Sequence, residues 1–146
     1  MISVVAPVFN EHSTLPELHR RLTDVLGTLG PYEIVLVDDG SSDGSWDALL
    51  ELAARDPHLR LLRLSRNFGH QAALSAGLDA AGGEAIVLMD ADLQDPPELI
   101  PQLVAKWREG FDVVYAIRGE REGEPRLRLA SISLFYRLLY RITSTD

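Results

Sequence analysis

Acidic residues crowd into the chain directly after the apolar run 85–89. Asp90, Asp92 and Asp95 follow one another within a few positions. Like charges this close repel, and each carboxylate loses hydration when it leaves bulk water, so such a cluster needs a cation or separate roles for its members. In an extended chain, Asp90, Asp92 and Gln94 would lie on one side and converge.

Carboxylate and amide oxygens are hard ligands that suit Mg²⁺ or Mn²⁺. Mg²⁺ usually takes one or two protein carboxylates and completes its shell with water and phosphate oxygens. Asp90 and Asp92, with Gln94, therefore predict a cation held against a diphosphate; a pair of solvated turn aspartates is the alternative. Asp95 is interpreted as a helix N-cap, with Glu98 in its capping box.

Polar residues also follow two earlier apolar runs. Asn10 and Glu11 come after the first run, and Asp38 and Asp39 come after the second. A carboxylate at 38 or 39 can accept a hydrogen bond from a nucleobase N–H or a ribose hydroxyl, and Gly40 lets a ligand approach the backbone. The alternative for all four is a role in capping loops and turns.

A third loop, "SRNFGHQAALSAG" at 65–77, follows the next run. Arg66, Asn67 and Gly69 are candidates for lining the same crevice. His70 is interpreted as structural because the sequence places no acid–base partner beside it, and a role as an acid or base is the alternative. The small residues that follow predict close packing of a helix on the sheet. Neither GxxxxGK[ST] nor GxGxxG occurs, so phosphate would be held by a cation and arginines.

The elements that must position these residues alternate along the chain. Short, solid apolar runs predict strands buried on both faces, and segments with helical spacing lie between them. This alternation predicts a three-layer α/β fold, with a mostly parallel central sheet and helices on both faces. Ligands bind such sheets beyond the carboxyl ends of the strands, where the polar residues lie. The predicted strands are Ile2–Val8, Ile34–Val37, Leu61–Leu64, Ala85–Met89 and Val113–Ile117, and the predicted helices span 15–29, 46–52, 72–78 and 99–107.

The bulk properties are those of one globular domain. The 146 residues are 46% hydrophobic and 25% charged. The chain has no cysteine, which excludes disulfides and zinc–thiolate sites. Its N-terminus does not resemble a signal peptide, and no apolar run approaches the roughly 18 residues of a membrane span. The net charge of −8 argues against a nucleic-acid partner.

The chain is predicted to divide into a core, 1–118, and a tail, 119–146, made of a charged loop and an amphipathic helix, and its charge is unevenly spread. From Arg118 onward there are six arginines and four acidic residues. Within the tail, 125–142 carries an apolar stripe beside a basic one, which predicts an amphipathic helix at a membrane surface. A helix that covers the edge of the sheet is the alternative.

Four motifs, "VVAPVFNE", "IVLVDDGSSDGS", "SRNFGHQAAL" and "LMDADLQDPPEL", in this order and spacing, resemble the inverting glycosyltransferases of family 2. They look most like the branch that transfers a sugar to a polyprenyl or dolichyl phosphate. The resemblance implies a GT-A fold, a Rossmann-like sandwich with its metal motif at a strand end. It covers nearly the whole chain.

The resemblance also implies roles for matching residues. The nucleotide would be bound by Pro7, Asn10, Glu11, Asp38, Asp39, Asn67, Gly69 and Asp90. The cation would be held by Asp90, Asp92 and Gln94. Asp92 and Arg118, the latter facing the phosphates, would be catalytic.

The implied activity is metal-dependent, hexosyltransferase-like transfer from a UDP- or GDP-sugar to a polyprenyl-phosphate lipid. A phosphate monoester, with a second pKa of about 6, is already largely ionised, whereas a sugar hydroxyl needs a general base. No base candidate follows Asp92, which favours phosphate; the alternatives are a sugar-hydroxyl acceptor and a nucleotide-binding fragment without turnover. Family members continue past this point, so we expect the N-terminal part of a longer, cytoplasmic protein, peripheral to or anchored at the membrane.

Two other classes cluster acids beside a parallel sheet. A dehalogenase-type phosphoryltransferase places its nucleophile after the first strand, and a phospho-receiver module places its paired acids there. Both need a downstream lysine, but Lys106 is the chain's one lysine and lies in a predicted helix. These classes therefore fit the sequence less well.

Overall fold

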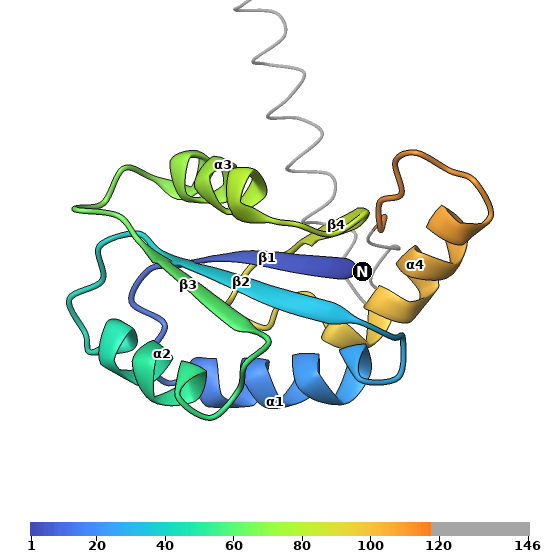
Figure 1. Cartoon of the computed structure of the whole chain (residues 1–146). Coiled ribbons are helices and arrows are strands. Elements are labelled where there is room, and N and C mark those ends of the chain that lie inside the picture. The colour runs from blue at the N-terminus through green and yellow to red at the C-terminus, as the bar shows by residue number, and fades with distance from the viewer. Residues whose placement is uncertain (118–146) are drawn as a thin grey trace, which may run out of the picture. The chain divides into compact units, whose positions relative to one another are not determined.

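The computed structural model describes residues 1–117, and its compact unit spans Met1–Tyr115. In this part of the chain, four parallel strands form one sheet in the order β3-β2-β1-β4 (Figure 1). The strands are β1 (Ile2–Val8), β2 (Tyr32–Asp38), β3 (Leu59–Arg63) and β4 (Ala85–Leu88). The helices are α1 (Leu15–Leu26), α2 (Ser45–Ala53), α3 (His70–Ala80) and α4 (Ile100–Arg108), the last preceded by a 3₁₀ turn, η1 (Pro97–Leu99).

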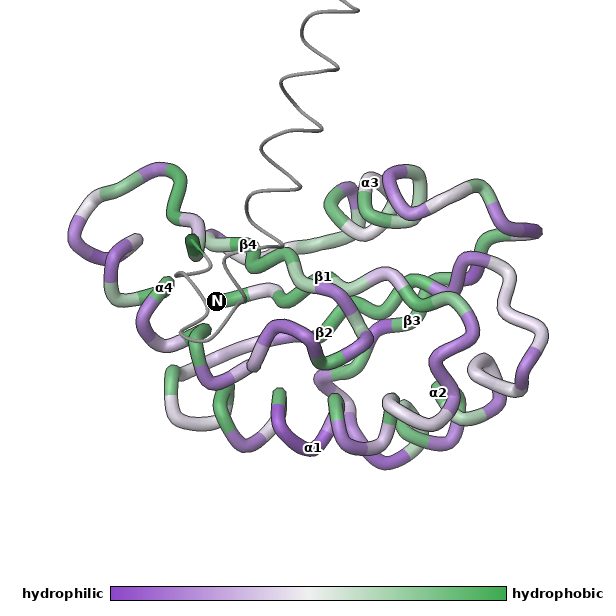
Figure 2. Tube along the Cα trace, turned by 180° about the vertical axis from the view of Figure 1, so that it is seen from behind, coloured by the Kyte–Doolittle hydropathy of each residue, from purple (hydrophilic) through white to green (hydrophobic). Residues whose placement is uncertain are grey.

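Helices cover both faces of the sheet (Figure 1). Successive strand residues point to opposite faces, so Val4 packs in the larger core with α1, α2 and α4, whereas Val5 packs in a smaller core beneath α3. Hydrophobic and hydrophilic residues alternate along the coil of α1 (Figure 2), whose leucines at 15, 18, 22 and 26 are buried. The predicted three-layer α/β architecture is confirmed.

Helix α3 lies close to the sheet because its contact residues are small. Ala73 and Gly77 are its buried positions. A Cβ at Gly77 would lie 2.3 Å from Val5 Cγ1 and 3.0 Å from Val37 Cγ2, so no larger residue fits without a shift. The small-residue pattern of this segment correctly predicts close helix–sheet packing.

The predicted fifth strand is wrong. Within residues 1–117, the segment 113–117 forms no strand, and Val113 and Tyr115 are 79% and 76% exposed. Apolar runs report only local preference, whereas a strand also needs a neighbouring edge to satisfy its backbone groups.

The start of the fourth helix also differs from the prediction. The N-cap positions of η1 and α4 are Pro96 and Leu99, and neither makes a side-chain capping bond. Glu98 does not serve a capping box; its carboxylate pairs with the guanidinium of Arg21 on α1. A cross-helix partner 77 positions away is invisible to a local capping pattern.

Among residues 1–117, none of the helices has both the length and the apolar character needed to cross a membrane. Arg118, the predicted tail 119–146 and its amphipathic segment 125–142 lie outside the described residues. The division of the chain at 118 therefore stays a prediction.

Candidate functional site

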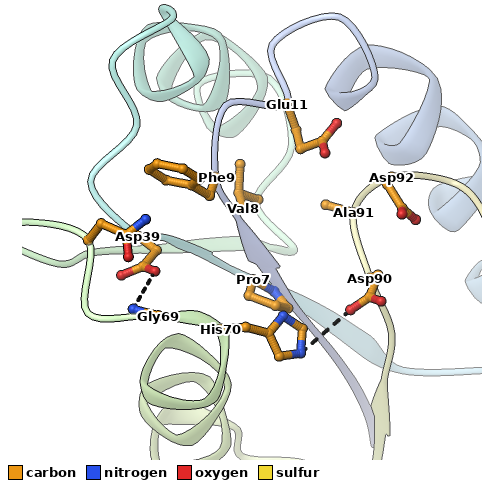
Figure 3. A pocket seen from close by; sticks show the side chains of 11 residues that line it. Pro7, Val8, Phe9, Glu11, Asp39, Gly69, His70, Asp90, Ala91 and Asp92 are labelled. Carbon is orange, nitrogen blue, oxygen red and sulfur yellow. Dashed lines mark hydrogen bonds and ion pairs between the residues drawn. The ribbon is translucent and has the colours of Figure 1, made fainter.

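A pocket of about 280 Å³ opens at the carboxyl ends of β1 and β4. The chain proceeds from β1 to β2 and β3 on one side, whereas β4 pairs with the other side of β1. Open α/β sheets bind ligands at such a reversal of strand order. The lining residues are Pro7, Val8, Phe9, Glu11, Asp39, Asn67, Gly69, His70, Asp90, Ala91 and Asp92 (Figure 3).

The loop after β1 is held by the loop after β2. Asn10, in the left-handed region with φ of 57°, donates its backbone N–H to Ser41 Oγ and accepts at Oδ1 from the Ser42 N–H. The Glu11 N–H donates to Ser45 Oγ at 3.0 Å. Asn10 thus joins two loops and does not line the pocket, whereas Glu11 does.

Asp43 completes this junction. Its carboxylate accepts hydrogen bonds from the Ser45 hydroxyl and N–H and from the His12 N–H. The Ser45 hydroxyl, followed by these backbone donors, lowers the pKa of Asp43. The motif "DDGSSDGS" therefore has two roles. It holds the loop after β1 in place, and it contributes Asp39 to the pocket lining.

Asp39 holds the loop that forms the pocket wall opposite β4. Its carboxylate accepts from the N–H groups of Phe68 and Gly69 at 2.8 and 2.9 Å. Gly40, with φ of 72°, lets the turn contact the same loop, since a Cβ there would lie 2.6 Å from the Arg66 carbonyl carbon. These contacts place Asn67 and Gly69 in the pocket wall.

Asp38 does not lie where the prediction expects it. Its side chain is completely buried and outside the pocket lining. Oδ1 accepts from the Ser41 N–H, and Oδ2 lies 3.1 Å from Arg63 Nε in an ion pair that lacks hydrogen-bond alignment. Adjacent residues at a strand end face opposite ways, so Asp38 and Asp39 cannot both face the ligand.

Asp90 and Asp92 line the pocket from the chain that follows β4, but their carboxylates do not converge. Asp90 points toward His70 (Figure 3), and Asp92 Oδ1 accepts from the Gln94 N–H at 3.0 Å. The expected extended backbone is wrong, because the chain turns here and Leu93 has φ of 61°. Gln94 does not line the pocket.

Asp90 and Asp92 still fit a divalent cation whose coordination shell is completed largely by water and phosphate oxygens. Among residues 1–117 no group of three His, Cys, Asp or Glu side chains forms a metal cage. Two carboxylates in one open pocket instead match a Mg²⁺ or Mn²⁺ ion that keeps water and phosphate ligands.

Sequence reasoning missed four lining residues, Val8, Phe9, His70 and Ala91, of which Phe9 and His70 carry side chains suited to ligand contacts. Phe9, 45% exposed, offers a ring face beside the acidic residues. His70, interpreted as structural, directs its ring at Asp90 with Nε2 3.7 Å from Oδ1. The sequence offered one signal for His70, its position at the start of a helix that follows a strand. Its partner Asp90 lies 20 residues later, and only the fold shows that the two side chains meet.

Of the predicted site residues that the structure describes, seven line the pocket together. They are Pro7, Glu11, Asp39, Asn67, Gly69, Asp90 and Asp92. Asn10, Asp38, Arg66 and Gln94 lie outside its lining, and Arg118 lies outside the described residues.

Two solved structures are similar to this chain. The mannosyltransferase PcManGT from Pyrobaculum calidifontis, in complex with GDP-Man and Mn²⁺, is similar with a TM-score of 0.68 and 26% identity over 83% of this chain and 36% of that chain. TarS from S. aureus is similar with a TM-score of 0.60 and 26% identity over 74% of this chain and 19% of that chain.

Two curated bacterial relatives match almost all of this chain. The uncharacterized glycosyltransferase YkcC of Bacillus subtilis (strain 168) is 48% identical over 99% of this chain, and the uncharacterized glycosyltransferase sll0501 of Synechocystis sp. is 46% identical over 97%. The chain spans 45% of the length of each. The model of the glycosyl transferase family 2 matches residues 3–144. With the parallel sheet and the acidic pocket at its strand ends, this match shows that the chain belongs to glycosyl transferase family 2.

Proposed function

We propose that this chain is the nucleotide-sugar-binding core of an enzyme that transfers a sugar, with inversion, to a lipid-phosphate acceptor. One observation carries the proposal: Asp90 and Asp92 share a pocket with Asp39, Asn67 and Gly69 at the point where the strand order reverses. GDP-Man and Mn²⁺ in the similar mannosyltransferase support a nucleotide-sugar donor and a divalent cation.

Each wall of the pocket has a role in this proposal. Asp90 and Asp92 would hold Mg²⁺ or Mn²⁺, and the bound ion would supply positive charge to offset the negative charge of the departing diphosphate. Phe9 packs its exposed ring against the flat face of the nucleobase. Asn67 lies in the loop that Asp39 anchors through the N–H groups of Phe68 and Gly69, and its side chain supplies a polar contact to the nucleotide.

Arg118 remains our candidate for a cationic contact to the phosphates. A guanidinium is permanently charged and matches phosphate oxygens in a two-pronged geometry. The sequence places it directly after the described residues.

The acceptor is proposed from chemistry. A lipid phosphate is already ionised at neutral pH, so transfer to it requires no deprotonation by the protein. A matched pair of acceptors, a polyprenyl phosphate and the corresponding polyprenol, tests this in the full-length protein. Transfer to the phosphate alone supports the proposal, and transfer to a hydroxyl contradicts it.

Membrane-surface binding through 125–142 completes the proposal. The basic and apolar stripes of this segment suit the interface of an anionic bilayer. Flotation with vesicles that contain anionic lipid tests it, with the chain ending at Tyr115 as the comparison, since Met1–Tyr115 forms the compact unit. Equal binding of both chains would contradict a role for the segment.

The donor and cation are tested by binding. A thermal-shift screen of UDP-, GDP- and dTDP-sugars with and without Mn²⁺ identifies the donor, and calorimetry then compares Asp92→Ala with wild type. We expect the metal-dependent part of the affinity to disappear. Asp79→Ala, an exposed aspartate on α3 outside the pocket, is the matched control. Unchanged nucleotide affinity in Asp92→Ala would refute the assignment.

A further inference from the structure

His70 faces Asp90 across the pocket from the start of α3. Its Nε2 lies 3.7 Å from Asp90 Oδ1, and the two side chains are 52% and 55% exposed (Figure 3). This separation is an ion-pair distance, longer than a hydrogen bond. Since both side chains are half exposed, a small rotation of either one brings the atoms into hydrogen-bonding range.

The two partners differ in how firmly they are held. His70 follows Gly69, whose N–H is bound by the buried carboxylate of Asp39, and it begins a helix that packs tightly on the sheet through Gly77. Asp90 lies at the start of the turn that follows β4. His70 is therefore the fixed partner, and Asp90 is the one whose carboxylate needs orienting.

We infer that His70 is a positioning residue, which donates a hydrogen bond from Nε2 to Oδ1 of Asp90 and so orients this carboxylate toward the divalent cation. This inference rests on the proposed function, because it takes Asp90 as a metal ligand. Carboxylate ligands are usually held by an outer hydrogen bond, and loss of that partner typically costs about 10- to 100-fold in metal affinity.

A glutamine at position 70 separates this role from one that needs the imidazole ring. Its side-chain amide is a neutral donor of similar reach but has no ring nitrogen to offer a metal. If His70 acts by donating a hydrogen bond, His70→Gln retains cation binding and His70→Ala does not. If the imidazole ring itself binds the cation, both His70→Gln and His70→Ala lose cation binding.

The test is titration of Mn²⁺ alone into the 146-residue chain, with free Mn²⁺ followed by electron paramagnetic resonance. Wild type is compared with His70→Ala, His70→Gln and Asp90→Ala. His58→Ala, directly before β3 and so at the opposite end of the sheet, is the control for removal of an exposed histidine paired with an aspartate. Circular dichroism verifies that each variant is folded.

We expect His70→Ala to raise the Kd for Mn²⁺ at least about tenfold, and His70→Gln and His58→Ala to stay near wild type. Wild-type affinity in His70→Ala, with binding lost in Asp90→Ala, would overturn this inference and leave the proposed metal site intact. Equal weakening in His70→Gln and His70→Ala would overturn the hydrogen-bond role. A wild-type chain that does not bind Mn²⁺ would overturn both the inference and the proposed metal site.

Discussion

The carboxylate of Asp39 accepts a hydrogen bond from the backbone N–H of Gly69 at 2.9 Å, which joins the end of β2 to the start of α3. Asp39 is only 3% exposed and also binds the N–H of Phe68. A buried carboxylate that accepts two backbone hydrogen bonds fixes the loop that donates them. This residue is therefore part of the framework of the pocket as well as of its lining.

We expect Asp39→Asn to destabilise the loop at Phe68 and Gly69 and to lower the affinity for the nucleotide. The amide has one acceptor oxygen, so one of the two backbone N–H groups faces another donor, at a cost of about 1.5–3 kcal/mol for a lost charged hydrogen bond. Hydrogen exchange should become faster at the amides of Phe68 and Gly69. Asp47→Asn, an exposed change on α2, should leave both unaltered. Unchanged exchange at 68 and 69 would contradict the anchoring role.

Ser45→Ala should lower the free energy of unfolding, because it removes a contact between the loop after β1 and the loop after β2. Ser45 is fully buried, and its Oγ accepts from the Glu11 N–H while donating to Asp43. Its removal leaves a backbone donor without its partner, which costs about 1–3 kcal/mol in free energy of unfolding. Urea denaturation measures this against Ser42→Ala, which removes an exposed hydroxyl. Equal stability of the two variants would rule out the proposed contribution.

Gly77→Ala should destabilise the fold although alanine favours helices. The added Cβ would overlap Val5 Cγ1 at 2.3 Å, and overpacking of this kind costs about 1–3 kcal/mol, against a gain of about 1 kcal/mol in helix propensity. Gly82→Ala is the control, since its Cβ would meet Glu33 and Met1 at 3.5 and 3.6 Å, which are ordinary contacts. A lower thermal midpoint in Gly82→Ala than in Gly77→Ala would contradict the packing argument.

Stability in acid should depend on Glu98. Hydrogen bonds from Arg21 lower the pKa of Glu98 from its usual 4.5 to about 2. A lowered folded-state pKa stabilises the fold above the unfolded value, and this contribution is lost as the pH falls from 4.5 through about 2.

Urea midpoints of wild type and Glu98→Gln test this at about pH 6 and about pH 2.5. We expect the wild-type advantage at the higher pH to shrink at the lower one, and salt to reduce it because the pair is exposed. Glu51→Gln on α2 controls for removal of an exposed carboxylate. A difference between wild type and Glu98→Gln that does not change with pH would contradict the ion pair's role.

Most of the fold could be predicted because its signals are local. Solid apolar runs predicted β1 to β4, and helical spacing predicted the four helices, with ends displaced by a few residues. The segment 113–117 carries the same apolar signal, yet it pairs with nothing within residues 1–117. Its failure shows that strand formation depends on an edge supplied by distant residues.

The site could be predicted only as a set of strand-end residues. Position at the carboxyl ends selected Glu11, Asp39, Asn67, Asp90 and Asp92, which line one pocket, and their roles in binding stay predictions. It could not separate Asp38 from Asp39, because a one-residue step reverses the direction of a side chain at a strand end.

The sequence by itself determined the layered α/β architecture and the family, because both depend on residue types and spacings along the chain. Tertiary structure alone decided that Asn10 binds the loop after β2, that Asp38 pairs with Arg63 on β3, that Glu98 pairs with Arg21, and that His70 meets Asp90. Hydrogen bonds and ion pairs act over a few ångströms, and residues tens of positions apart come within that range only when the strands pair and the helices pack.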